Sequence, residues 1–317
     1  MKKVILGKSN LEVSYIGMGV LPLGPNQRNL PVAEGAEILR YALDRGISFI
    51  DTAQYYQAYP YIKETLKGTC HEPVISSKSL TPDYDQMLAA IEEARRATDR
   101  DVIDIFLLHE VRSGDFIRRR GAWEALQEAK AKGIVKAVGV STHNVDVTEE
   151  MAAVEECDVV FPLINYAGLG IRKGLGPGTA EEMLSAIEKC HRVNKGVFAM
   201  KIFGGGNLTT GYQKALDYAT GCSSIDSLMI GLGSKKDVDD IFDYMEGRMN
   251  PSYNPDVSKK RIIIEEDSCE GCGTCLKMCA SKAIYYNERG LAQIDPSKCL
   301  TCGYCAPVCP CRAIIFY

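Results

Sequence analysis

Eight cysteines toward the C-terminal end of the sequence have the spacing of metal ligands. They form two runs, CEGCGTCLKMC beginning at Cys269 and CLTCGYCAPVC beginning at Cys299, and each run follows the pattern C-x2-C-x2-C-x3-C. Of the 13 cysteines in the chain, nine lie between positions 269 and 311. Such clustering favours metal binding over a disulfide framework, which would spread the cysteines along the chain.

A second group of polar residues lies where apolar segments end. The segments FIDT, ISSK and FLLH contain Asp51, Lys78 and His109 at or next to their last position, and Tyr56 follows five residues after Asp51. Any one of these residues alone could be a surface charge or a hydrogen-bonded histidine. Three at the same position on successive segments indicate a site, because the carboxyl ends of the strands carry the active site in a parallel barrel.

The elements that would position these residues alternate short apolar segments with longer amphipathic ones. Helices are expected over 31–46 and 83–98, where apolar residues recur at helical spacing. Eight apolar segments predict strands: 15–20, 47–52, 73–78, 102–109, 135–141, 157–165, 195–201 and 226–233.

Eight strand–helix units in about 250 residues predict an α/β fold, a TIM (β/α)8 barrel over residues 1–250. The segment 2–14 could form a hairpin that closes the bottom of this barrel. An open, doubly wound sheet is the alternative. It is disfavoured because the first strand–helix turn, GMGVLPLGPNQRN, lacks the G-x-G-x-x-G pattern of a dinucleotide-binding loop.

The pattern changes near residue 250, where prolines, asparagines and lysines without periodicity predict a linker over 251–259. A second, small α+β domain is expected over 260–317. Its two halves repeat at an offset of thirty residues, from the cysteines to the segments KAIYY and AIIFY, which we expect to pair as strands. Neither half can bury its own apolar core, so a metal centre must supply much of the stability.

The cysteine spacing resembles that of the bacterial two-cluster ferredoxins over residues 260–317. This resemblance implies two 4Fe-4S clusters, in which the last cysteine of each run binds the cluster of the other run. Two zinc sites are the alternative, although zinc ribbons use pairs of cysteines rather than runs of four. The implied ligand sets are Cys269, Cys272, Cys275 and Cys309 for one cluster, and Cys299, Cys302, Cys305 and Cys279 for the other.

The first domain resembles the aldo-keto reductases through the segments FIDTAQYY, SSK, DIFLLHE and GIVKAVGVSTHN, in that order. The resemblance implies a catalytic tetrad of Asp51, Tyr56, Lys78 and His109, with Tyr55 as the alternative to Tyr56. In this chemistry a nicotinamide supplies hydride and the phenol protonates the developing alkoxide. A nearby ammonium is expected to lower the phenol's pKa from about 10, and His109 would orient the carbonyl.

The same resemblance implies an NAD(P)H site along GVSTHN and the last loop, GLGSKKDVDD. Four positions depart from the family pattern: Thr142 replaces an asparagine, Phe161 a glutamine, Met200 an aromatic residue and Asp239 an arginine. The candidate contacts are Ser141, Thr142, Asn165, Gly231, Gly233, Ser234 and Lys235.

These features predict an oxidoreductase that reduces a small carbonyl compound, or oxidises the alcohol, and carries electrons on its clusters. Hydride moves two electrons and a cluster moves one, so a flavin could couple them. Two alternatives stay open: an electron-transfer protein whose barrel binds a flavin or a redox protein partner, and a plain reductase with structural or oxygen-sensing clusters.

The composition restricts the expected cellular location and the classes of binding partner. The balance of 37 basic and 41 acidic residues gives a net charge of −4, which argues against nucleic-acid binding. No secretory signal and no membrane-length apolar run is visible, so we expect a cytoplasmic protein without a membrane partner. The run FIRRR at 116–120 predicts a solvated face.

Overall fold

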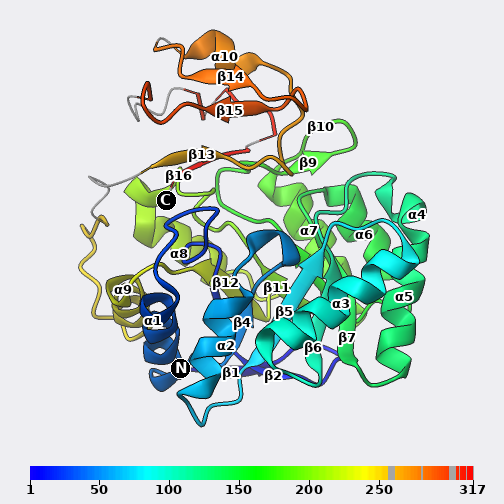
Figure 1. Ribbon diagram of the computed structural model, residues 1–317. Helices are drawn as coiled ribbons and strands as arrows, with labels where there is room; N and C mark the ends of the chain where they lie inside the picture. Colours follow the sequence, from blue (N-terminus) through cyan, green and yellow to red (C-terminus); the bar gives the residue numbers. More distant parts are fainter. Residues whose placement is uncertain (256–260, 280, 300–304, 307, 312, 317) are drawn as a thin grey trace.

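A computed structural model of the protein describes residues 1–255, 261–279, 281–299, 305–306, 308–311 and 313–316. Its larger part is a closed barrel of parallel strands in the order β11-β12-β3-β4-β5-β6-β7-β8 (Figure 1). All eight predicted strands are present, and the open doubly wound sheet is excluded. The strands are β3 (Ile16–Gly19), β4 (Phe49–Asp51), β5 (Val74–Ser79), β6 (Ile103–Leu108), β7 (Val135–Thr142), β8 (Val159–Pro162), β11 (Gly196–Ala199) and β12 (Ser227–Gly231).

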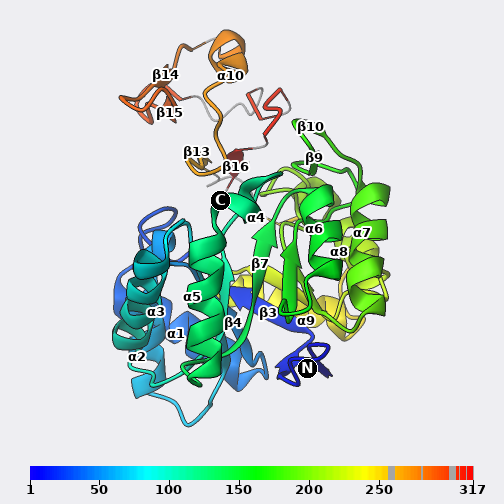
Figure 2. The ribbon, with the colours of Figure 1, turned by 90° about the vertical axis from the view of Figure 1, so that its right-hand side faces the viewer.

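Helices surround the barrel, as Figure 2 shows from the side. The predicted helices at 31–46 and 83–98 correspond to α1 and α3. None of the described helices is long and apolar enough to cross a lipid bilayer. The helices of this part are α1 (Val32–Asp44), α2 (Tyr59–Lys67), α3 (Tyr84–Thr98), α4 (Asp115–Arg118), α5 (Arg120–Ala131), α6 (Val145–Ala153), α7 (Ala180–Arg192), α8 (Tyr212–Thr220) and α9 (Lys235–Met245), with short 3-10 turns η1 (Gln54–Tyr56) and η2 (Thr209–Gly211).

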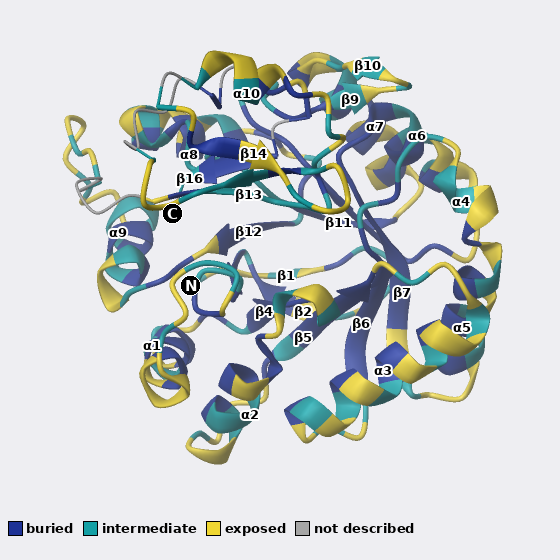
Figure 3. Ribbon diagram, turned by 45° about the horizontal axis from the view of Figure 1, so that its top comes forward, coloured by how far each residue is buried: buried dark blue, intermediate teal, exposed yellow. Residues whose placement is uncertain are grey.

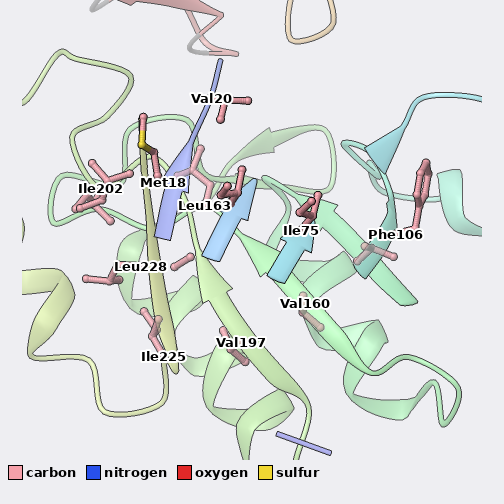
Figure 4. Packing of buried hydrophobic residues seen from close by; sticks show 14 of the residues in the cluster. Met18, Val20, Ile75, Phe106, Val160, Leu163, Val197, Ile202, Ile225 and Leu228 are labelled. Atoms are coloured by element: carbon pink, nitrogen blue, oxygen red, sulfur yellow. The ribbon is translucent and has the colours of Figure 1, made fainter. Parts of the chain in front are cut away.

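Alternating side chains along each strand divide the core into two clusters. In β6, Phe106 and Leu108 pack toward the helices, whereas Ile105 and Leu107 fill the barrel interior. Figure 3 shows that the strands are buried while the helices expose their outer faces, and Figure 4 shows part of the outer cluster. Each large apolar side chain buried in this way contributes about 1.5–3 kcal/mol.

An N-terminal hairpin closes one end of the barrel, as predicted. Its strands β1 (Lys3–Ile5) and β2 (Glu12–Ser14) are antiparallel, and Leu6 and Val13 join the interior cluster. The hairpin lies at the end opposite the C-terminal part of the chain (Figure 1). It therefore leaves the carboxyl ends of the strands available for a site.

The described residues within 261–316, here called the C-terminal module, form two antiparallel strand pairs, β13 with β16 and β14 with β15. The expectation that the final apolar segment pairs with KAIYY is wrong, because β16 pairs with the strand that opens the first repeat. KAIYY instead forms β14 and turns back onto β15. The module's elements are β13 (Ile262–Ile264), α10 (Thr274–Met278), β14 (Ile284–Tyr286), β15 (Ala292–Ile294) and β16 (Ile314–Phe316).

The C-terminal module lies over the carboxyl end of the barrel (Figures 1 and 2). Strand β16 rests on the loop 204–206, where the Phe316 N–H donates to the Gly205 carbonyl at 2.9 Å. Gly205 and Gly206 have left-handed φ values of 63° and 83°, and a Cβ on Gly206 would lie 2.3 Å from the Phe316 carbonyl oxygen. The three consecutive glycines thus serve a close backbone approach. The predicted linker, 251–259, falls partly outside the described residues.

Candidate active site

Strand alternation aims the three predicted strand-end residues into the barrel. Residues two apart on a strand face the same side. Phe49 belongs to the interior cluster, so Asp51 faces inward, and His109 continues the inward series of Ile105 and Leu107. Lys78 lies opposite Leu107 in the β5–β6 register. The parallel strands therefore bring these side chains together at the carboxyl end.

Lys78 and Asp51 form a buried ion pair. The Lys78 ammonium donates to Asp51 Oδ1 at 2.9 Å and Oδ2 at 2.7 Å, and to the Thr52 carbonyl at 2.7 Å. The two side chains are only 1% and 6% exposed. Burial lowers the pKa of Lys78 and raises that of Asp51, while the attraction within the pair opposes both shifts.

Tyr56 completes the predicted group. It lies on the turn η1, directly after β4, with its ring edge-to-face against His109 at 5.6 Å between centroids. The Lys78 ammonium lies 4.8 Å from the centre of the same ring. Tyr55, the alternative, is 38% exposed. The structure thus places Tyr56 rather than Tyr55 beside Lys78 and His109.

The pKa of Tyr56 differs from the expectation that a nearby ammonium lowers it. Burial raises its pKa well above 10, and the carboxylates of Asp51, Glu265 and Asp267 raise it further. Any lowering by Lys78 does not outweigh these effects, because Asp51 neutralises the ammonium. Tyr56 is therefore fully protonated at neutral pH and available as a proton donor.

His109 is neutral. Burial lowers its pKa well below the usual range, and the cationic Lys78 and Arg119 lower it further. The side chain is 5% exposed, and its Nδ1 is a buried atom without a hydrogen-bond partner among the described residues. A neutral imidazole can donate a ring N–H to a carbonyl oxygen.

Arg119 supports this site in a way that sequence reasoning missed. In the run FIRRR, Arg118 and Arg120 are exposed as predicted, but Arg119 is only 7% exposed. Its guanidinium donates to the His109 carbonyl at 2.7 Å and to the Ser79 carbonyl at 2.8 Å. Arg119 therefore joins the ends of β5 and β6 behind the site. In the sequence, three consecutive arginines do not indicate which one is buried.

A cavity of about 580 Å³ opens beside Asp51 and Tyr56. The predicted cofactor residues Gly231 and Gly233 line it, and Gly231 pairs with Gly19 on the adjacent strand. The two glycines lie side by side on neighbouring strands, and a Cβ on Gly231 would lie 2.9 Å from Pro22 Cγ. Phe161 and Met200, two of the four positions that depart from the family pattern, line the same cavity.

The other residues of the last loop act at the start of helix α9. Ser234 is its N-cap and accepts the Asp237 N–H at 3.1 Å. Lys235 pairs with Glu37 at 3.8 Å, in a partly exposed contact. Asp237 also accepts the Gly233 N–H at 2.9 Å. A carboxylate thus occupies a backbone donor that could bind a phosphate.

Three predicted cofactor residues are used by the chain itself. Ser141 accepts the Glu110 N–H at 2.9 Å, and Thr142 donates to the Val111 carbonyl at 2.6 Å. The Asn165 side chain accepts the Leu169 N–H at 2.9 Å. None of the three lines the cavity beside Tyr56, so their contact with a cofactor stays a prediction.

The first predicted set of cysteines gathers in the C-terminal module. Burial and the nearby thiols of Cys309, Cys269 and Cys272 raise the pKa of Cys275 to about 11. Four crowded thiols of this kind suit a cationic centre that binds them as thiolates. Two backbone N–H groups, of Gly271 and Ala292, donate to Cys269 Sγ at 3.4 Å. The residues therefore fit a 4Fe-4S cluster.

The second set is described in part. Cys279 accepts the Ala283 N–H at 3.2 Å, and Cys305 is buried in the same cluster that Cys299 packs against. Cys302 lies outside the described residues. Among those that are described, no three His, Cys, Asp or Glu side chains converge on a single-ion site. A 4Fe-4S cluster needs no such convergence, because its cysteines bind separate irons.

Comparison with known families divides the chain in the same way. The model of the aldo/keto reductase family matches residues 15–235, and that of a 4Fe-4S dicluster domain matches residues 268–313. The first match covers most of the chain and contains all four residues of the predicted tetrad.

Curated relatives are distant. The uncharacterized oxidoreductase YqkF of Bacillus subtilis is 24% identical over 182 residues, which cover 53% of this chain and 56% of the relative. The glyoxal reductase of the same organism is 26% identical over 170 residues, covering 52% and 57%. The chain thus spans about half the length of the curated relatives it matches.

Solved structures share the barrel. The aldo-keto reductase AKR11C1 of Bacillus halodurans, a holo form, gives a TM-score of 0.64 at 19% identity, covering 79% of this chain and 92% of that one. An aldo-keto reductase of Bombyx mori in complex with NADP gives 0.59 at 16% identity, covering 81% and 95%. At these identities the likeness concerns the fold.

Proposed function

Because the chain belongs to the aldo/keto reductase family, we propose that it reduces a small carbonyl compound with NADH or NADPH, or oxidises the corresponding alcohol. The observation that carries this proposal is the meeting of Asp51, Tyr56, Lys78 and His109 beside one cavity at the carboxyl end of the barrel. We assign the chemistry to a barrel domain, residues 1–250, and the clusters to residues 260–317.

The side chains divide the work of carbonyl reduction. When bound, the reduced nicotinamide supplies hydride to the carbonyl carbon. His109, which is neutral, binds the carbonyl oxygen and orients it. Tyr56 then transfers its phenolic proton to that oxygen, and the product is the alcohol. Lys78 and Asp51 hold the polar end of the site in place without a net charge.

The lining of the cavity supports binding of a nicotinamide. Gly19, Gly231 and Met200 would hold the ring, with the polarizable thioether of Met200 in place of an aromatic neighbour. Gly233, Ser234 and Lys235 are the candidates at the phosphate end, with Arg28, whose guanidinium donates to the Gly233 carbonyl. Ser141, Thr142 and Asn165 remain candidates that would need to exchange their present partners.

We further propose that the C-terminal module binds two 4Fe-4S clusters through the two sets of four cysteines, which would pass single electrons. Its position over the cavity mouth also favours a second function, electron transfer between the clusters and a flavin or redox partner at the barrel.

The test of this coupling is anaerobic addition of NADH or NADPH. Bleaching of the cluster absorbance, faster with added flavin, would support coupling. Bleaching by dithionite but by neither nucleotide would contradict the coupling. Turnover of an aldehyde, measured separately, tests the reductase activity.

The charges of the last loop predict a preference for NADH. The 2′-phosphate of NADPH would meet Asp237 and Asp240, which line the cavity. Two nearby cations are already paired with carboxylates, Lys236 with Asp240 and Arg45 with Asp239, and Arg28 is bound to the Gly233 carbonyl. We expect the KM for NADPH to exceed that for NADH by about tenfold, equivalent to about 1.4 kcal/mol.

Substitution of Asp237 tests the origin of this preference. Asp237→Asn keeps an acceptor for the Gly233 N–H and removes the charge, so the two KM values should approach each other. Asp243→Asn is the matched control, because Asp243 lies farther along α9 and pairs with Arg248. Tighter use of NADPH by the unmodified protein would contradict the prediction.

Replacing one cysteine tests the cluster assignment. Protein purified anaerobically should contain about eight irons per chain, and Cys275→Ser should lower this to about four or fewer. The second cluster should weaken too, because Cys309 loses its cluster while its neighbours in sequence hold the other. Cys311→Ser, outside the repeated spacing, should keep about eight irons. Stoichiometric zinc with little iron would favour zinc sites instead.

A further inference from the structure

The wall of the cavity beside Tyr56 is completed by the C-terminal module. Glu265, Ile315 and Phe316 line the cavity that also contains Asp51 and Tyr56. The Glu265 carboxylate is close enough to Tyr56 to contribute to the rise in its pKa. A charged side chain from outside the barrel therefore lines the cavity in which a substrate would bind at Tyr56.

Glu265 is bound by a lysine held in unusual backbone geometry. Lys201 follows β11 and has a left-handed φ of 57°, which costs a non-glycine residue about 1 kcal/mol or more. Its ammonium donates to Glu265 Oε2 at 2.7 Å, and the two side chains are 20% and 13% exposed. The strained backbone thus aims Lys201 at the module, and the pair is largely shielded from water.

A second strained residue helps to fix Glu265. Glu110 follows His109, has a left-handed φ of 47° and is largely buried. The Ser268 hydroxyl lies 3.4 Å from a Glu110 carboxylate oxygen and 3.3 Å from Glu265 Oε2. Glu265 therefore has contacts from both Lys201 and Ser268, which hold its carboxylate in one position.

The cationic side chains that line the cavity lie in different parts of it. Three cationic residues are described in its lining: Arg28, Lys201 and Arg261. Arg28 is bound to Gly233 at the phosphate end, and Arg261 is exposed at the start of the module. Lys201 is the one whose charge also lowers the pKa of His109. An anionic group on a substrate at this end would meet a lysine that Glu265 already neutralises.

We infer that Glu265 makes the site selective for uncharged carbonyl compounds by masking Lys201. This inference rests on the proposed function, in which the carbonyl oxygen binds between Tyr56 and His109. Removing the negative charge would take away the carboxylate that Lys201 contacts and leave the charges of Glu110 and Asp267 near it. A substrate carboxylate could then take the place of Glu265, because an ammonium that loses its ionic partner gains from another. A residue of the C-terminal module thus determines how tightly a charged substrate binds.

The test compares two ligands of the same shape in the full-length protein, 4-carboxybenzaldehyde and its uncharged amide, 4-formylbenzamide. Calorimetry gives the Kd of each. In Glu265→Gln we expect the Kd of the carboxylate to fall about tenfold and that of the amide to change less than about twofold. Adding Lys201→Met should remove the gain. Glu266→Gln is the matched control, because Glu266 bonds within the module to Asn287 and Arg289.

Three outcomes would overturn the inference. They are an equal change in both Kd values for Glu265→Gln, the same gain for Glu266→Gln, or a gain in carboxylate binding that persists when Lys201→Met is added to Glu265→Gln. The double variant shows whether the gain depends on Lys201. Turnover is recorded on the same samples, so failure to reduce either aldehyde would count against the proposed function, whereas the Kd ratio is read without turnover.

Discussion

Tyr56→Phe is expected to lower the rate of carbonyl reduction by a factor of about 10²–10⁴, the usual contribution of a positioned proton donor. The phenol supplies a proton and little contact area. The ring can keep its edge-to-face packing on His109 at 5.6 Å, so the fold should be retained. The KM for the nicotinamide should change by less than about twofold. Steady-state kinetics with a fixed aldehyde measures both quantities.

Tyr55→Phe is the matched control for this prediction. Tyr55 is the neighbouring tyrosine on the same turn, but its side chain is exposed and its carbonyl accepts a hydrogen bond from Asn26. Its variant should keep nearly the full rate. An inactive Tyr55→Phe together with an active Tyr56→Phe would show that the other tyrosine is the donor.

Lys78→Met is expected to abolish activity and to destabilise the protein by about 3–5 kcal/mol. The variant leaves the Asp51 carboxylate without the ammonium that it contacts at 2.7 Å, in a site where it is 6% exposed. A buried charge without its partner carries a cost of this size. Urea unfolding measures the change in free energy, and the same samples give the rate of reduction.

A double variant separates structure from chemistry at this pair. Adding Asp51→Asn to Lys78→Met removes the unpaired charge, so much of the lost stability should return. The activity should not return, because the polar support beside Tyr56 is still missing. Recovery of activity in the double variant would show that Lys78 acts only through stability.

Local periodicity carried much of the prediction. The apolar segments predicted where each strand ends, which is why Asp51, Lys78 and His109 could be placed together at the carboxyl end of the barrel before any contact was known. The hairpin and the strand-helix units follow from similarly local patterns. The resemblance to the two-cluster ferredoxins implied that Cys309 lies with the first run, and the neighbours of Cys275 agree.

Features that depend on distant contacts could not be predicted in this way. Short apolar strands such as β14 and β16 look alike, so the sequence does not specify that β16 pairs with β13. The left-handed backbone of Glu110 and Lys201 is imposed by tertiary structure and leaves no pattern in the residue types. The polar side chain of Ser141 could bind a cofactor or the chain itself, and only the loop geometry shows its present partner.

The close approach between β16 and the loop 204–206 limits how this protein can be re-engineered. A different redox domain could not simply be grafted onto the barrel. The glycine loop has no side chains, so β16 comes close enough for the Phe316 N–H to donate to the Gly205 carbonyl. Any replacement domain would need a strand of the same depth there, and side chains at positions 205 and 206 would block it. The loop and the strand are therefore one exchangeable unit, to be transplanted together.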